Sequence, residues 1–130
     1  MAEIRAYLTL IGDEFDVDYV SKEMKMDPDE IRKKDEILRN GSLFGHTEWG
    51  LETRLEIGDE VEPVLRQLIN RTISNVDTMR KLSKELHAAW HILILLKVYN
   101  ASPAIILPLD ILQYAVEIGA GIGFDTYVLT

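Results

Sequence analysis

The chain has 130 residues, no cysteine, 47% hydrophobic and 28% charged residues, which is the composition of one globular domain. This composition excludes a disordered tail, a disulfide scaffold, thiolate zinc sites and cysteine nucleophiles. The net charge of −8 is uneven, because residues 1–62 carry 17 acidic and 8 basic side chains whereas residues 63–130 carry 5 and 6. A nucleic-acid binder needs the opposite field, so we expect neither nucleic acid nor an anionic membrane as a partner. We expect a single domain over residues 1–130.

The first expected elements are a strand and a short helix. Apolar and polar residues alternate from Ile4 to Leu10, which is the pattern of a half-buried strand. A helix capped by Asp16 or Asp18 follows, and Met26-Asp27-Pro28 ends it. Its inward residues are expected to be Val17, Val20 and Met24.

A polar, irregular segment follows from Asp29 to Thr47, with turn residues at Asn40-Gly41 and Gly45. The one regular element expected in it is a helical turn at Asp29–Lys34. Because long loops in compact domains are uncommon and often functional, this segment is the first candidate for a working surface.

The middle of the chain predicts a strand and two helices. Alternation from Trp49 to Leu55 indicates the strand, and Gly58-Asp59-Glu60 opens the first helix, with Pro63 in its first turn. Ser74 is the expected cap of the second helix. The apolar stripes of the two helices are Val61, Val64, Leu65, Leu68, Ile69 and Thr72, and then Met79, Leu82 and Leu86.

The segment from His87 to Tyr99 predicts a strand that is apolar on both faces through its middle. Such a strand is covered on both sides, or on one side with a partner chain on the other. A strand at Ala104–Ile106, a helix from Pro108 to a stop at Gly119, and a last strand at Phe124–Leu129 complete the chain.

From Trp49 onward the predicted order is β-α-β-β-α-β, the split ferredoxin-like arrangement, preceded by an added strand and helix. The expected fold is therefore α+β, a sandwich of one mostly antiparallel sheet with helices on one face.

Five features carry a family resemblance: the opening strand Ala6–Leu10, the acidic helix start at Phe15-Asp16, the polar stretch with Asn40-Gly41, the strand beginning at Trp49, and the run from Gly119 through Phe124 to Val128. Together they resemble a bacterial family catalogued as domain of unknown function 4279. The glycine-rich Gly119–Gly123 segment and the helix at Asn75–Leu86 depart from it. The resemblance implies no established chemistry and supplies no catalytic residues.

Acidic residues are densest from Asp13 to Glu36. The four acids of residues 13–18 could supply oxygen ligands to a hard cation, but the spacing of a calcium-binding loop is missing, and helix capping accounts better for them. We expect no metal and no cofactor. An acidic face could steer a basic protein partner, or simply keep the protein soluble. The candidate docking residues are Asp13, Glu14, Asp16, Asp18, Asp29 and Glu30.

Two other patterns give no site. His87 and His91 lie four residues apart, which on a strand separates their side chains by roughly 13 Å, too far to share one ion. Gly119–Gly123 follows a helix and precedes a strand, the reverse of a phosphate-binding loop. No nucleophile–base pair is visible, so no catalytic residue is predicted.

Trp49 lies beside the long loop, close in sequence to Glu48, Glu52 and Arg54. The three charged residues are expected to form a row on one face of the strand. Trp49 is either an interface anchor or pocket wall, with Arg54, or a core residue that covers the sheet edge.

The leading hypothesis is a non-enzymatic protein-interaction domain, an immunity-like inhibitor whose acidic half occupies a basic partner. The alternative is a small-molecule sensor with a pocket between the sheet and residues 26–48, lined by Trp49 and Arg54. A homodimer through edge strands is a third hypothesis. Because Glu3 and Arg5 interrupt the apolar start of the chain, we predict no export signal and a cytoplasmic protein.

Overall fold

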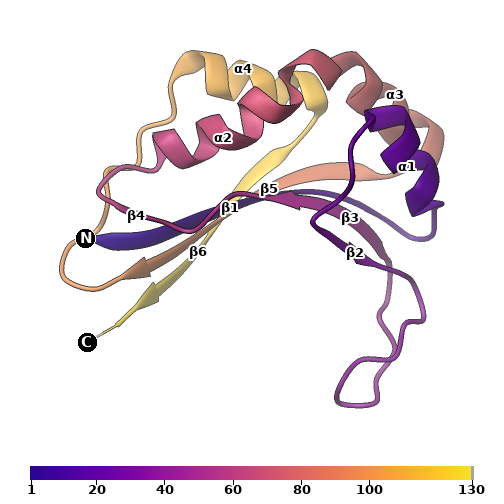
Figure 1. Ribbon diagram of the computed structural model, residues 1–130, viewed down its shortest axis with the longest axis horizontal. Coiled ribbons are helices and arrows are strands. Elements are labelled where there is room, and N and C mark those ends of the chain that lie inside the picture. Colours follow the sequence, from indigo (N-terminus) through magenta and orange to yellow (C-terminus); the bar gives the residue numbers. More distant parts are fainter. Residues whose placement is uncertain (130) are drawn as a thin grey trace.

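A six-stranded sheet carries all of the described helices on one of its faces (Figure 1) in the computed structural model, which describes residues 1–129. The predicted α+β class, the mostly antiparallel sheet and the one-sided helical layer are confirmed. In chain order the elements are β1 (Ala2–Gly12), α1 (Val17–Met24), β2 (Glu30–Arg32), β3 (Thr47–Glu52), β4 (Glu56–Gly58), α2 (Glu62–Thr72), the 3-10 turn η1 (Ile73–Asn75), α3 (Val76–Leu86), β5 (Ala89–Val98), α4 (Leu109–Ile118) and β6 (Gly121–Val128).

The first strand organises the sheet. The strand order is β2-β3-β1-β5-β6, and the short β4 also pairs with β1. β1 runs antiparallel to β3, β4 and β5, whereas β6 runs parallel to β5 because α4 crosses over between them. The sheet therefore ends in two different edges, the three-residue β2 and the eight-residue β6.

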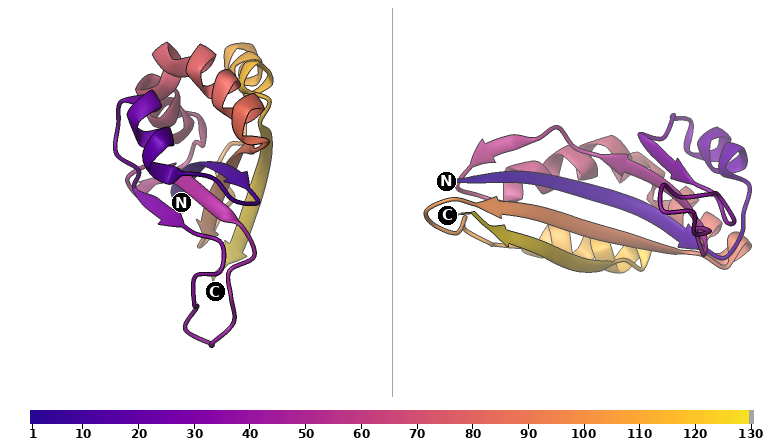
Figure 2. Two further views of the ribbon diagram at one scale, coloured as in Figure 1. Left: turned by 90° about the vertical axis from the view of Figure 1, so that its right-hand side faces the viewer. Right: turned by 90° about the horizontal axis from the view of Figure 1, so that it is seen from below.

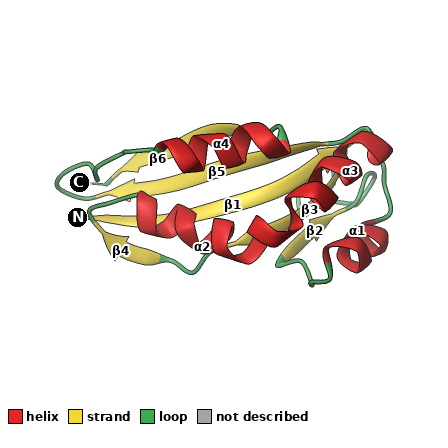
Figure 3. Ribbon diagram, turned by 90° about the horizontal axis from the view of Figure 1, so that it is seen from above, coloured by secondary structure: helices red, strands yellow, loops and turns green. Residues whose placement is uncertain are grey.

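The hydrophobic core lies between the sheet and the helices, with α2 above β1 and α4 above β5 and β6 (Figure 3). Alternate residues of the two central strands point into it, and side chains such as Leu8 and Ile94 are fully buried. Trp49 and Trp90 meet edge to face there, with ring centroids 6.1 Å apart. Burial of this one face supplies the main stabilisation of the fold.

The helical turn expected at Asp29–Lys34 is wrong, because Glu30–Arg32 pairs with β3 as strand β2. In this register Ile31 lies opposite Trp49, so the alternation Glu30-Ile31-Arg32 follows the sheet and not a helix. Residues 33–46, called the arm below, then form a hairpin-like loop closed by a bridge between Ile37 and Leu43. The arm projects from the sheet on the side away from the helices (Figures 1 and 2).

Four further details differ from the sequence prediction. Ala104–Ile106 is not a strand, since Ala104 makes a single bridge to Glu60. The elements from Trp49 onward therefore do not follow the split ferredoxin-like order β-α-β-β-α-β, and β1, which was expected to be an addition to that arrangement, lies at the centre of the sheet. Ser74 does not cap α3, because η1 occupies that position. β6 begins at Gly121 instead of Phe124, and β4 is an added strand.

The helix boundaries otherwise follow local signals. Asp16 accepts hydrogen bonds from the backbone N–H groups of Asp18 and Tyr19, which caps α1. Pro63 lies in the first turn of α2, and Gly119 ends α4 with φ of 70°. Within residues 1–129, no helix is long and apolar enough to cross a membrane.

Candidate binding surface

No helix of residues 1–129 covers the second face of the sheet, called the open face below (Figure 2, right). It is formed by the alternate residues of each strand that point away from the core, among them Tyr7 on β1 and Leu93 on β5. Leu93 keeps 40% of its surface exposed although its neighbour Ile94 is fully buried. The sequence predicts that β5 is apolar on both faces, and in the structure the helices cover one of these two faces.

Two glycines hollow the open face. One cross-strand row runs from Glu30 through Gly50, Thr9 and His91 to Gly121. Gly121, and Gly123 two positions further along β6, contribute no side chain to the open face, so the surface sinks beside His91 and Leu93. A Cβ placed on Gly121 would meet nothing within 4 Å, which shows that the space beside His91 is open.

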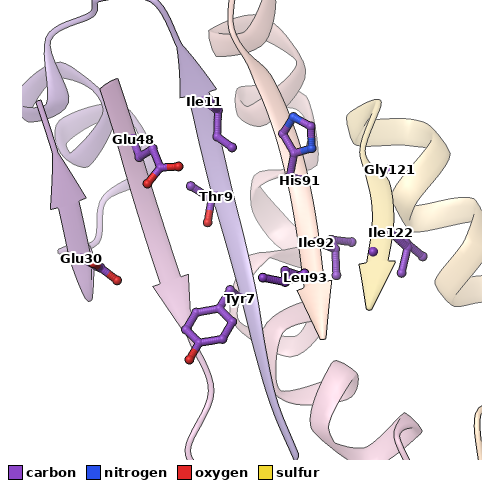
Figure 4. A pocket seen from close by; sticks show the side chains of 11 residues that line it. Tyr7, Thr9, Ile11, Glu30, Glu48, His91, Ile92, Leu93, Gly121 and Ile122 are labelled. Carbon is purple, nitrogen blue, oxygen red and sulfur yellow. The ribbon is translucent and has the colours of Figure 1, made fainter. Parts of the chain in front are cut away.

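The resulting hollow has a volume of about 570 Å³ and is open to solvent. Figure 4 shows Glu30 and Glu48 on one side of it, Tyr7 and Thr9 on β1, and Leu93 on β5. It therefore combines carboxylates on the β2–β3 side with apolar and aromatic surface on the β5 side. The residues that line it are Tyr7, Thr9, Ile11, Glu30, Glu48, His91, Ile92, Leu93, Gly121, Ile122 and Gly123.

A second hollow of about 620 Å³ adjoins the first and shares Tyr7 and Leu93 with it. Tyr99 and Tyr127 lie at its far end, where each hydroxyl donates to a carboxylate, Tyr99 to Glu3 at 2.9 Å and Tyr127 to Asp125 at 3.2 Å. The hydrogen bond to Glu3 raises the pKa of Tyr99, and the charge of Asp125 raises the pKa of Tyr127. Both phenols therefore stay neutral donors at the margin of the surface.

Carboxylates border the open face along β3. Glu48 lies in register with Ile11, and Glu52 with Tyr7, so both side chains belong to the open face. Glu48 contacts His46 at 3.2 Å, and among residues 1–129 no lysine or arginine forms an ion pair with either glutamate. These two negative charges are therefore available to a cationic partner.

The acidic segment of residues 13–36 is largely engaged in the fold. Asp13 pairs with Lys34 at 3.0 Å, and Asp29 pairs with Arg71 at 3.1 Å and accepts the backbone N–H of Glu52. Lys81 pairs with Glu23 at 2.9 Å, which lowers the pKa of that carboxyl. Arg71 and Lys81, which belong to the second half of the chain, thus neutralise part of the acidic half, so its formal charge overstates its free negative surface.

The eight predicted binding residues do not form one site. Glu14 and Asp18 are exposed near α1, and Asp16 is occupied in capping. Glu30 lines the first hollow, where Arg32 approaches it at 3.5 Å. The remaining predicted residues, Asp13, Asp29, Trp49 and Arg54, make contacts within the fold or lie elsewhere on the surface.

Trp49 lies in the core and not on a pocket wall, which corrects the interface interpretation and agrees with the core alternative. Its ring is fully buried, and its indole N–H donates to Ser21 Oγ at 2.9 Å. Arg54 follows the end of β3, is exposed, and approaches Glu56 at 3.6 Å. The expected charged row is therefore reduced to Glu48 and Glu52, and the pocket beside residues 26–48 lies on the open face without Trp49 or Arg54.

His87 does not lie on the strand that the sequence predicts for it, because β5 begins at Ala89. His87 ends α3 in the left-handed conformation, whereas His91 points from β5 into the first hollow. Among residues 1–129, no three His, Asp or Glu side chains are placed to hold a metal ion. Gly119–Gly123 leads from α4 into β6, so no helix begins at this segment.

The sequence did not identify Tyr7, His91, Leu93, Gly121 and Gly123 as site residues. The sequence contained a signal, because Tyr7 and Leu93 occupy the positions of β1 and β5 that alternate with the core residues, where large apolar or aromatic side chains indicate a contact surface. What the sequence lacked was the pairing of β5 with β6, which brings the two glycines beside them.

The family model described as a domain of unknown function (DUF4279) matches residues 2–129 of the chain. Neither the curated proteins nor the solved structures contain a match to the chain.

Proposed function

Because this chain belongs to the DUF4279 family, whose description assigns no activity, we propose its function from its own surface: it is a non-enzymatic protein-interaction domain that binds a basic partner on the open face. The observation that carries the proposal is the pair of adjoining hollows, in the first of which the Glu48 carboxylate lies beside apolar and aromatic surface, with Glu52 further along β3 on the same face. A partner that fits them presents lysine or arginine next to an apolar side chain.

Two contributions to binding follow from this arrangement. Leu93, Leu95 and Tyr7 offer apolar and aromatic surface whose removal from water favours association. Glu48 and Glu52 at the β3 side add an attraction that speeds encounter and fixes orientation, and that weakens as salt rises. The arm supplies further apolar contact, since Ile37 is 74% and Leu43 59% exposed.

The role we propose is that of an immunity-like inhibitor in the bacterial cytoplasm, which blocks a basic protein by occupying its surface. The acidic composition and small size support this role.

The test compares three versions of the protein as affinity baits in a lysate of its source cells, at low and at high salt. One bait is the wild type, one carries Glu48→Lys and Glu52→Lys, and the matched control carries Glu14→Lys and Asp18→Lys. Both doubles change the net charge by the same amount. We expect a basic protein to be retained by the wild type and the control, lost from the open-face double, and released by salt.

Loss of the same protein from the Glu14 and Asp18 variant, with retention by the open-face variant, would contradict the proposal and return the site to the acidic segment around α1. Retention of the protein by all three baits would contradict both binding sites, the open face and the acidic segment around α1.

A small-molecule sensor is the second candidate, because the first hollow falls within the roughly 300–1,000 Å³ range of ligand pockets. Its ligand would be a small amphipathic cation, held by Glu48 and by the face of Tyr7. Thermal unfolding in the presence of a panel of aliphatic and aromatic amines tests this candidate. A rise in the midpoint that Tyr7→Ala abolishes would support it, and the absence of any rise would reject it.

A further inference from the structure

We propose that a second copy of this chain pairs with the free edge of β6, so that two sheets join into one and their α4 helices lie side by side. The surface is separate from the open face, and it consists of the β6 edge and of five exposed apolar side chains of α4 and β6, called the β6 strip. They are Leu109, Leu112, Val116, Phe124 and Val128.

The two edges of the sheet differ in how they are protected. β2 is three residues long and carries Glu30 and Arg32, which are features that hinder pairing with another chain. β6 is eight residues long, and Asp125 is its one charged residue. A long, weakly charged edge strand is a template for a further strand.

Backbone N–H and C=O groups of β6 point to the side of the strand away from β5, where they could bind another strand. The N–H of Leu129 donates to the carbonyl of Val98 at 2.8 Å. Because successive residues of a strand turn their N–H and C=O groups to opposite sides, those of Phe124, Thr126 and Val128 face the free edge. An antiparallel second copy would satisfy these groups in both chains at once, as a twofold axis requires.

The apolar side of α4 faces this edge. Asp110 pairs with Arg66 of α2, and Tyr114 shares a hydrogen bond with Thr72 of α2, so one flank of α4 faces α2. Leu112 and Val116 lie on the opposite flank, which in Figure 3 is the outer margin of the sheet above β6.

The side chains of β6 complete the strip. Phe124 and Val128 are in register with the buried Ile94 and Val98, so they point to the helical side of the sheet but remain exposed beyond α4.

The amount of surface suits a dimer. The five side chains are between 40% exposed, for Phe124, and 78% exposed, for Val116. Burying each removes on the order of 100 Å² of apolar area from water. Together with the strand edge, this approaches the roughly 800 Å² per partner of a stable interface.

Charge also favours a second copy at this place. The chain carries −8, but residues 63–130, which contain the whole strip, carry 5 acidic and 6 basic side chains. Asp125 points to the open face, where it accepts a hydrogen bond from Tyr127. Two copies that meet along β6 bring their nearly neutral sides together and keep their acidic halves apart.

Sedimentation equilibrium over a range of protein concentrations tests the proposal. The disrupting variant carries Val116→Lys and Val128→Lys, which place like charges on both copies, and lysine is a better helix former than the valine it replaces in α4. The matched control is Ile37→Lys, since Ile37 is 74% exposed on the arm. Circular dichroism and the urea midpoint of each monomer check that the fold is retained.

We expect the wild type and Ile37→Lys to form dimers, and the double variant to raise the dimer dissociation constant at least about tenfold. Thr126→Pro, which removes an N–H from the free edge, should have the same direction of effect. A wild type that stays monomeric at all concentrations would overturn the proposal, as would a dimer that the double variant leaves intact. Neither result bears on partner binding at the open face, which the lysate experiment measures separately.

Discussion

The two faces of the sheet are built from the same strands but differ in what covers them. On the helical face, Leu8 and Ile94 are fully buried, whereas their neighbours Tyr7 and Leu93 line an open hollow. The covered face supplies the free energy of folding, and the open face has apolar surface that folding leaves in contact with water. Substitutions at two adjacent residues of one strand should therefore have different effects. The one on the helical face should lower the stability of the fold, and the one on the open face should weaken partner binding.

The sharpest test of this difference is a pair of adjacent substitutions in β5. Ile94→Ala should lower the free energy of unfolding by about 2–5 kcal/mol, because it leaves a cavity beneath the helices. Leu93→Ala should cost less than about 1 kcal/mol, because the side chain is partly exposed, but it should weaken partner binding. Urea unfolding followed by circular dichroism measures both, and equal losses of stability would refute the division between the faces.

A buried hydrogen bond predicts the next largest effect. Thr53 Oγ1 accepts the backbone N–H of Ala6 at 3.0 Å just beyond the end of β3. Thr53→Val keeps the volume but leaves that N–H without a partner, which should cost about 1–3 kcal/mol. Thr9→Val on the open face is the control, with an expected change within about 0.5 kcal/mol. A similar urea midpoint for the two variants would show that the Thr53 bond contributes little.

Filling the first hollow should increase the stability of the fold and at the same time abolish partner binding. Gly121→Val should raise the free energy of unfolding by roughly 0.5–1 kcal/mol, because a strand glycine is entropically costly and its Cβ has free space. The same side chain would occupy the first hollow and abolish partner capture. Gly58→Val, which also has free space but lies in β4, should leave capture intact. Capture by Gly121→Val at the wild-type level would exclude the hollow as the site.

The smallest expected effect is a pH dependence on the helical side. Lys81 lowers the pKa of Glu23, so this pair stabilises the fold above the ordinary pKa of a glutamate, and its contribution is lost as the pH falls through the lowered value. Lys81→Met should therefore lower the urea midpoint more at pH 7 than at pH 3. Lys84→Met is the control for the loss of a lysine. A difference of the same size at both pH values would assign the effect to packing.

Local signals predicted much of the fold. The alternation in residues 4–10, the Asp16 cap and the proline in the first turn of α2 each determine a local conformation, and the structure contains all three. The strand β2 was missed because three residues are too few for a period to be visible, and it forms through pairing with β3.

The site could not be predicted in the same way, because it depends on which face of the sheet the helices leave open. The alternation in β1 separates two faces, but it does not show that Tyr7 lacks a cover. Thr9 and Gly121 are 112 positions apart in the sequence and fall in one row through the registers of β1, β5 and β6. Such pairing between distant strands cannot be recognised in a single sequence.

Methyl chemical-shift mapping of the protein with its captured basic partner tests the central claim most directly. The methyl groups of Ile11, Leu93 and Leu95 lie on the open face, and those of Ile94 and Leu96 lie beneath the helices, so isoleucine and leucine methyls report on both faces. We predict that the largest shifts on binding fall on Ile11, Leu93 and Leu95. Shifts confined to methyls of the helical layer, with these three unchanged, would contradict the account.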